Sequence, residues 1–388
     1  MRRLTKMRAG VVLLACAALA GWLAIAAWPY IASAALLVDL SGSSSTLRSL
    51  MPIRGAAVHA RDLSLPTRHG TIGARLYTPE GSASRAIVVV PGIHAGGVDE
   101  PRLDRLSRRL AGAGAIVLSV PLPDLRAYRI LPESTDMIED AARWFAERGG
   151  AGGRVGLIGV SFSGGLAVAA AGRAALGDRL TAVVSLGGHG DLPRTLRYLC
   201  TGRLPDGTLR PPHDYGIAVA LREALPHLVP ASDLAAADRA LVAYLDGSSL
   251  AESDPQRADA LVNQARVITQ SLDDPARAIL DSIIRRDVAA VGSRLLPWVE
   301  QIGGHPALSP ERSAAPTVPV FLIHGRDDTV IPSSETTQLA ASLAGRGTPV
   351  EWLLTPIVSH ADLQVGALLL DQWRLVRFWT AAWRALAG

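Results

Sequence analysis

The sequence contains very little lysine and very little cysteine. Lys6 is the single lysine, so the formal net charge of +4 is carried by arginine. No cluster of basic residues is interleaved with aromatic residues, and we therefore expect no nucleic-acid partner. The 2 cysteines, Cys16 and Cys200, lie far apart in the chain. We expect neither a disulfide between them nor a metal site built on thiolates, and Cys200 fits a small apolar filler.

Charged residues are also absent from a long stretch near the N-terminus. Residues 9–38 carry no charge, and this stretch exceeds the roughly 20 residues that cross a bilayer. Basic residues precede it, at Arg2, Arg3, Lys6 and Arg8. The pattern predicts an uncleaved membrane anchor, or a signal peptide cleaved after Ala24-Ile25-Ala26 or Ala32-Ser33-Ala34, and the length of the apolar run favours the anchor. The basic flank predicts that the rest of the chain lies outside the cytoplasm, secreted if the leader is cleaved.

The composition changes along the chain and divides it into segments. After the anchor or signal segment over residues 1–40, we expect a Ser/Gly-rich linker over residues 41–57. We then expect a globular core in two parts, residues 58–191 and residues 316–388. Between them, residues 192–315 contain no good strand pattern, and we interpret this segment as a helical cap inserted over the core.

Apolar runs alternate with helical periodicity in both parts of the core. They predict a hairpin over residues 63–79 and strands over residues 87–90, 116–120, 155–158, 182–186, 318–323 and 350–354. They predict helices over residues 102–111, 136–147, 166–175, 335–344 and 368–386. This alternation indicates an α/β fold with a mostly parallel central sheet flanked by helices. In the cap, Asp254-Pro255 and Asp274-Pro275 are typical of helix starts with aspartate as the cap.

The candidate chemistry centres on Gly159-Val160-Ser161-Phe162-Ser163-Gly164-Gly165. An apolar run leads into this segment, and an Ala-rich helical stretch follows it. A serine at such a sharp strand-to-helix turn stands clear of the sheet, at the positive end of the following helix. Because serine is a weak nucleophile at neutral pH, this interpretation requires a base and an acid that orients the base.

Residues suited to both partner roles follow in the sequence, each after an expected strand. The strand over residues 318–323 leads to Asp327 and Asp328, and the strand over residues 350–354 leads to His360. The carboxyl ends of parallel strands meet at one edge of a sheet, where the sites of such folds form. The order Ser, Asp, His therefore predicts a catalytic triad.

With these motifs, the sequence resembles the α/β-hydrolase family over roughly residues 63–387. The pattern His-Gly-x-x-Asp-x-x-Ile-Pro, which begins at His324, is typical of the family and selects Asp328 over Asp327. The resemblance implies a nucleophile, a general base and an orienting acid, which are Ser161, His360 and Asp328. One departure is Ser163, where the family motif has glycine. It leaves open a shifted turn with Ser163 as the nucleophile, although a glycine at position 159 inside the strand would then weaken that strand.

The resemblance also implies an oxyanion hole made of two backbone N–H groups. One belongs to Phe162, the residue after the nucleophile, and the other belongs to Ile93, in the loop after an early strand. Gly92 would let that loop approach closely. His94 and His189 are expected at the same edge of the sheet, as candidates for substrate binding. No histidine spacing indicates a metal site, and we expect no cofactor.

These observations predict a serine hydrolase that cleaves an ester through an acyl-enzyme, on the non-cytoplasmic side of a membrane. Its expected partners are an acyl ester substrate, small or lipid-like, and the membrane that holds the N-terminal segment. A thioesterase or peptidase with the same triad is an alternative. A non-catalytic binding module of the same fold is another, because function resides in the site and not in the fold.

Overall fold

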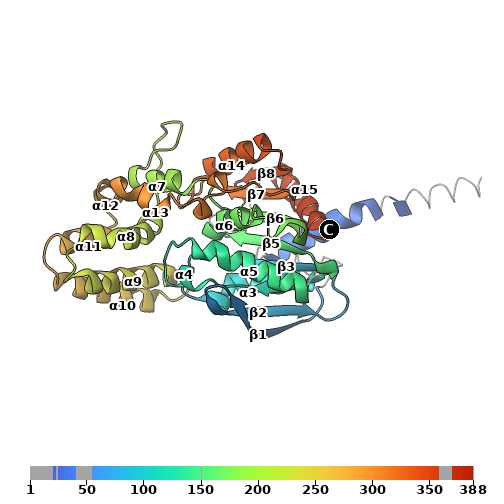
Figure 1. The fold of residues 1–388 in the computed structure, drawn as a ribbon, viewed down its shortest axis with the longest axis horizontal. Helices are drawn as coiled ribbons and strands as arrows, with labels where there is room; N and C mark the ends of the chain where they lie inside the picture. The colour runs from blue at the N-terminus through green and yellow to red at the C-terminus, as the bar shows by residue number, and fades with distance from the viewer. Residues whose placement is uncertain (1–20, 23–24, 41–54, 150, 358–368, 388) are drawn as a thin grey trace, which may run out of the picture.

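The computed structural model describes residues 21–22, 25–40, 55–149, 151–357 and 369–387. Its strands are β1 (Val58–Thr67), β2 (Gly70–Pro79), β3 (Arg85–Val90), β4 (Ala115–Ser119), β5 (Val155–Val160), β6 (Leu180–Leu186), β7 (Val320–Gly325) and β8 (Val350–Thr355). They form one 8-stranded sheet in the order β1-β2-β4-β3-β5-β6-β7-β8 (Figure 1). β2 runs antiparallel to both neighbours, and every pair from β4 to β8 is parallel. The predicted mostly parallel sheet is therefore confirmed.

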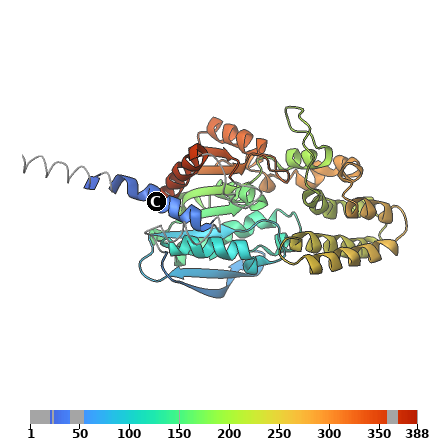
Figure 2. The ribbon, with the colours of Figure 1, turned by 180° about the vertical axis from the view of Figure 1, so that it is seen from behind.

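Helices cover both faces of this sheet (Figures 1 and 2). They are α3 (Pro101–Gly112), α4 (Pro123–Arg126), α5 (Glu133–Arg148), α6 (Phe162–Ala171), α14 (Ser334–Gly345) and α15 (Leu369–Ala385). Side chains of each strand alternate between the two faces. In β3, Ile87 and Val89 pack in a cluster with α3 and α15. Val88 and Val90 pack in a second cluster with α5, α6 and α14. Burial on both faces explains why these strands are continuous apolar runs in the sequence.

The strand register brings several loops to one edge of the sheet. Val90 of β3 lies opposite Gly159 of β5, and Val160 lies opposite Leu186 of β6. Leu186 in turn lies opposite Ile323 of β7. Because these parallel strands end level with one another, the loops that follow them all begin at the same edge. This edge carries the candidate site.

The segment between β6 and β7 is helical. It contains α7 (Leu192–Thr201), α8 (Asp214–Leu228), α9 (Leu234–Leu250), α10 (Pro255–Gln270), α11 (Ala276–Ile284), α12 (Val288–Leu295) and α13 (Val299–Gly303). Figures 1 and 2 show these helices projecting from one edge of the sheet, with α9 and α10 side by side. α10 begins as predicted, since Asp254 accepts a hydrogen bond from Arg257 N. The prediction for Asp274 is wrong, because Pro275 occupies the cap position of α11 and Asp274 lies outside it.

The described part of the apolar leader is helical over residues 25–40. Its last turns enter the core, where Ser33, Ala35 and Leu36 are buried. None of the helices in the described ranges is both long enough and apolar enough to cross a bilayer. Residues 1–20, which hold Cys16 and the basic flank, lie outside the described residues, as do residues 41–54 of the predicted linker.

Candidate active site

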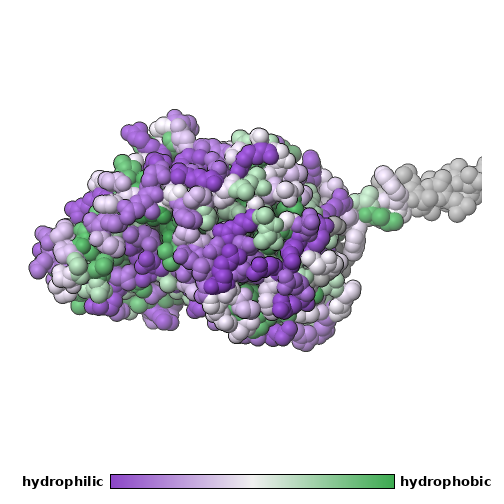
Figure 3. Space-filling view, in the orientation of Figure 1, coloured by the Kyte–Doolittle hydropathy of each residue, from purple (hydrophilic) through white to green (hydrophobic). Residues whose placement is uncertain are grey.

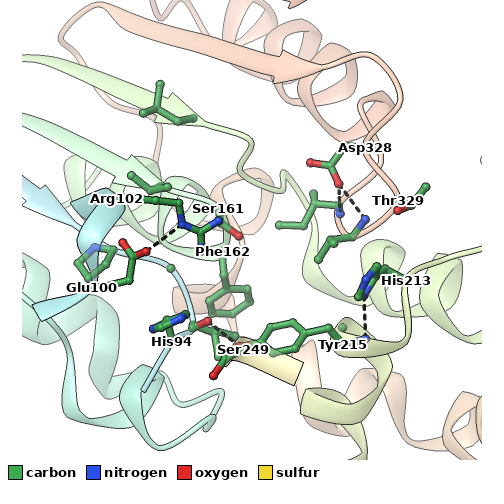
Figure 4. Close-up of a pocket in the computed structure, with 18 of the residues that line it drawn as sticks. His94, Glu100, Arg102, Ser161, Phe162, His213, Tyr215, Ser249, Asp328 and Thr329 are labelled. Carbon is green, nitrogen blue, oxygen red and sulfur yellow. Dashed lines mark hydrogen bonds and ion pairs between the residues drawn. The ribbon is translucent and has the colours of Figure 1, made fainter. Parts of the chain in front are cut away.

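Ser161 occupies the tip of the turn between β5 and α6. Its backbone has φ 55° and ψ −130°, a region that residues with a side chain rarely adopt. The turn is held from both sides, because Ser161 N donates to Leu186 O at 2.7 Å and Gly164 N donates to Ser161 O at 2.8 Å. The Ser161 side chain lines a cavity at the edge of the sheet (Figure 4). This is the geometry of a strained nucleophile elbow.

The sharp turn at Ser161 is sterically possible only because two nearby residues, Gly159 and Gly164, have no side chain. A Cβ atom on Gly159 would lie 2.2 Å from the carbonyl oxygen of Ser163. A Cβ atom on Gly164 would lie 2.4 Å from Ser185 Oγ, on the neighbouring strand. No real Cβ contact is that short, so a larger residue at either position would force the backbone apart. The glycines that precede and follow the serines are therefore required by packing.

Ser163 lies in the first turn of α6, away from the tip. Its side chain is fully buried, and its Oγ donates a hydrogen bond to Pro91 O at 2.5 Å. The hydroxyl thus ties the elbow to the loop after β3. This placement accounts for the departure from the family motif, since serine is small enough for the position and gains a partner there. Of the two serines, the structure places Ser161 at the tip and in the cavity wall.

The loop after β3 presses directly against Ser161. A Cβ atom on Gly92 would lie 2.9 Å from Ser161 Cβ, so only glycine permits this approach. The next residue, Ile93, lines the cavity, and its carbonyl oxygen accepts a hydrogen bond from Tyr215 Oη at 2.7 Å. Phe162 is the first residue of α6, where a backbone N–H has no acceptor within the helix. Both N–H groups expected to form the oxyanion hole therefore belong to residues that flank Ser161.

Tyr215 is a functional candidate that the sequence did not reveal. It belongs to α8, and burial raises the pKa of its hydroxyl, which stays protonated as the donor. The Gly92–Ile93 peptide is thus held between two hydrogen bonds, one from Ser163 to Pro91 O and one from Tyr215 to Ile93 O. Since the partners are distant in the sequence, no local pattern could indicate this contact.

We expect Tyr215→Phe to lower kcat for a short-chain ester by about fivefold, with KM little changed. The reason is that one net hydrogen bond, about 1 kcal/mol, no longer positions the Ile93 N–H. Tyr244→Phe is the matched control, because Tyr244 Oη donates to Asp214 within the helical segment. The measurement is steady-state kinetics of both variants. An equal loss of kcat in both variants would show that the Tyr215 hydrogen bond affects kcat only through the stability of the fold.

Asp328 is buried in the loop after β7. Its Oδ1 accepts hydrogen bonds from Val330 N at 2.8 Å and from Ile331 N at 3.0 Å. These two bonds fix the carboxylate at the cavity wall (Figure 4). Asp327 also reaches the cavity, but its side chain is 83% exposed and lies 3.7 Å from Arg210. The structure thus distinguishes a fixed, buried carboxylate at position 328 from a solvated one at 327.

His324 supports the Asp328 loop, a role that the sequence analysis missed. Its buried ring donates from Nε2 to Ile331 O at 2.8 Å, and Nδ1 accepts from the Thr336 hydroxyl at 2.7 Å. Nε2 also lies 3.4 Å from Asp328 Oδ2. The histidine of the His-Gly pattern therefore holds the loop in place. The structure brings Ser161 and Asp328 to one cavity, and His360, the predicted base, lies outside the described residues.

The two histidines expected to bind substrate lie in different places. His94 lines the cavity, and its Nδ1 accepts a hydrogen bond from Gly96 N at 3.0 Å. Burial lowers the pKa of His94, so the ring is neutral at pH 7 and Nε2 carries its proton. His189 is fully buried and stacks on Phe162, with ring centroids 4.8 Å apart. It donates to Leu308 O from beneath the elbow. A role in substrate binding is therefore kept for His94 alone.

The cavity has a volume of about 910 Å³ and extends from the sheet to the helical segment. Glu100 and Arg102 form an ion pair in its wall, with Oε1 and Nε 2.8 Å apart (Figure 4). Burial raises the pKa of Glu100, but hydrogen bonds from Arg102 and Leu103 N outweigh this effect and hold the pKa below its usual value.

Among the described residues, no group of histidine, cysteine and carboxylate side chains is arranged to hold a metal ion. Cys200 is buried, and burial raises the pKa of its thiol to about 12.

Comparisons with known proteins agree with this architecture. No family model matches the sequence, and no curated protein matches it. Among solved structures, an esterase from the archaeon Pyrobaculum calidifontis matches 92% of this chain and 90% of its own, with 19% identity and a TM-score of 0.50. The chain has the α/β-hydrolase fold.

Two further solved structures with this fold are less similar. An arylesterase matches 86% of this chain and 86% of its own at 16% identity, with a TM-score of 0.47. An acylaminoacyl peptidase from Pyrococcus horikoshii matches 87% of this chain at 13% identity and a TM-score of 0.47, over 42% of its own length. At this level of identity the similarity concerns the fold, so the function of this α/β-hydrolase-fold protein has to be argued from its site.

Proposed function

We propose that the chain is a serine hydrolase that cleaves an ester through an acyl-enzyme. The observation that carries this proposal is the backbone of Ser161, held at φ 55° in the wall of a large cavity. Such strain persists only where the surrounding structure enforces it, and it is typical of catalytic positions. Here the hydrogen bonds from Ser161 N to Leu186 O and from Gly164 N to Ser161 O hold it, and the glycines at positions 92, 159 and 164 leave room for it.

In the proposed mechanism, Ser161 Oγ attacks the ester carbonyl while His360 accepts its proton. Asp328 orients His360 and stabilises its charged form. The N–H groups of Ile93 and Phe162 donate to the developing oxyanion. Attack forms a tetrahedral intermediate that carries this oxyanion. Its collapse releases the alcohol, which takes the proton from His360. Water then attacks the acyl-enzyme by the same route, with His360 as base, and the acid product leaves.

Covalent labelling of the full-length protein tests this proposal directly. A fluorophosphonate probe reacts with an activated serine, and we expect one adduct per chain, at Ser161. The site is read by mass spectrometry of the digested protein. A folded protein that takes up no probe would instead be a binding module with the same fold, and the proposed activity would be withdrawn.

We further propose that the hydrolase is anchored in a membrane and faces away from the cytoplasm. The basis is the basic flank before residue 9, followed by the uncharged run to residue 38. A reporter enzyme that is active only outside the cytoplasm, fused after Gly388, should be active. A matched reporter that works only in the cytoplasm should be silent at the same position. The opposite pair of results would reverse the orientation.

A further inference from the structure

The C-terminal end of the apolar leader forms part of the cavity wall. Leu37 and Leu40, which are one helical turn apart, both line the cavity that contains Ser161. The preceding residue, Leu36, is 7% exposed and belongs to the core cluster on the α3 and α15 face of the sheet. A leader that served only for targeting would have no reason to complete the wall of the candidate active site.

Several contacts hold this helix against the hydrolase fold. Asp39 pairs with Arg109 of α3, with Oδ2 and Nη1 3.2 Å apart. Tyr30 packs on Trp373 of α15, with ring centroids 5.4 Å apart. The Arg384 guanidinium of the same helix lies over the Tyr30 ring, 5.7 Å from its centroid. These contacts lie in the middle of the helix and at its C-terminal end, and they join it to two different helices. Its position over the α3 and α15 face is therefore defined by the fold.

The two ends of the cavity differ in chemistry. Beside the leader, six apolar side chains line the cavity, and the charged side chains of Glu100, Arg102 and Arg105 line it next to them; the apolar set is Leu37, Leu40, Leu103, Leu106, Leu375 and Trp379. All six apolar residues belong to the core cluster on this face or pack against it. The end beneath the helical segment combines apolar side chains, among them Leu192, Leu196 and Val219, with more polar and charged ones, including His213, Ser249, Glu252 and Arg286. Ser161 lies at the edge of the sheet that both ends share. A substrate with a long apolar arm fits the six apolar side chains beside the leader.

We propose that the apolar end, formed jointly by the leader, α3 and α15, is the binding site for a long acyl chain. This inference rests on the proposed function, because the acyl group would be the one transferred to Ser161. The end beneath the helical segment then receives the alcohol part of the ester. The acyl-chain site lies outside the helical segment, and two of its six apolar residues, Leu37 and Leu40, precede the core.

The exposed start of the same helix indicates where such a substrate comes from. Trp22, Ile25 and Trp28 are 64%, 76% and 54% exposed, and they continue the uncharged run from residue 9. Figure 3 shows hydrophobic side chains on the described start of this helix, next to the grey atoms, whereas hydrophilic residues dominate much of the domain surface. Tryptophan is enriched where a protein meets the membrane interface. The helix thus leads from an exposed apolar surface, which we expect to meet the membrane, to the apolar end of the cavity.

The first test measures chain-length preference with p-nitrophenyl esters of 2 to 16 carbons, using the full-length protein. Leu37→Trp and Leu40→Trp should fill the apolar end. We expect kcat/KM to fall more steeply as the ester lengthens, with each methylene excluded from the site costing roughly fourfold relative to the shortest ester. Val38→Trp is the matched control, since Val38 is not among the described residues of the cavity wall. An unchanged chain-length profile in active Leu37→Trp and Leu40→Trp enzymes would overturn the proposal.

A second measurement needs no variant. A fluorophosphonate with a 16-carbon chain and a photoreactive group at the end of that chain should label Ser161 of the wild-type protein. On irradiation, the end of the chain should then crosslink to the residues next to it. We expect crosslinks within residues 37–40, 103–106 or 375–379. Crosslinks confined to residues 192–219 would place the chain beneath the helical segment and overturn the inference. If the probe does not react with the protein at all, the proposed function fails, and this inference fails with it.

The source of the ester is decided by presenting it in two ways. The same long-chain ester is supplied as a dilute monomer, or embedded in phosphatidylethanolamine and phosphatidylglycerol vesicles that contain the reconstituted enzyme. Faster hydrolysis of the embedded ester, by tenfold or more at equal total concentration, supports delivery from the bilayer. Equal rates identify a free acyl ester and overturn the membrane route.

Discussion

Replacing Ser161 with alanine is expected to abolish fluorophosphonate labelling and to lower kcat for a short-chain ester by about 10⁴- to 10⁶-fold. The loss is this large because no covalent intermediate can form, and only binding and the oxyanion hole would still act. The fold should survive, since alanine keeps the small Cβ that already fits beside Gly92. Circular dichroism and thermal unfolding of the variant are the measurements that check whether it is folded.

Ser163→Ala is the matched control for this experiment. The two serines lie on one turn, but Ser163 is buried and its hydroxyl donates to Pro91 O. Losing that bond costs about 1 kcal/mol, so we expect full probe labelling and a decrease in kcat of no more than about tenfold. A probe adduct found on Ser163 would show that the nucleophile had been assigned to the wrong serine.

Much of the fold was predictable because burial leaves a clear pattern. β3, β5 and β6 are buried on both faces, and each is mostly apolar in the sequence. α6 was misplaced, however. Glycines favour the end of a helix, so the predicted helix began at residue 166, whereas α6 begins at Phe162. Here Gly164 and Gly165 are in the first turn because the neighbouring strand and His189 leave no room for a Cβ atom.

The supporting contacts of the site were not predictable, because they join residues that are far apart in the sequence. Tyr215 and Ile93 are 122 residues apart, and Ser163 and Pro91 are 72 residues apart. Neither pair has a spacing that a motif could reveal. The leader shows the same limit. Its apolar residues indicate a membrane segment, but only the packing of Leu36 shows that the run also contributes to the core. His360 and residues 1–20 lie outside the described residues, so the predictions for them stand untested.

Asp328→Asn should lower kcat by about 10⁴-fold while leaving the protein folded. The asparagine carbonyl oxygen can still accept from Val330 N and Ile331 N, so the loop keeps its shape. The amide group cannot stabilise a positively charged histidine, and it favours the wrong tautomer of His360. Probe labelling should slow by a similar factor, because the same activation of Ser161 drives both reactions.

Asp327→Asn provides the comparison at the adjacent position. The Asp327 side chain is 83% exposed, and water screens its interaction with Arg210. We therefore expect kcat to change by less than about twofold. Both variants are measured at one pH with one short-chain ester, alongside their melting temperatures. If Asp327→Asn proves the more damaging of the two while both proteins remain folded, the acid lies one residue earlier. The buried carboxylate at position 328 would then serve only to close the loop after β7.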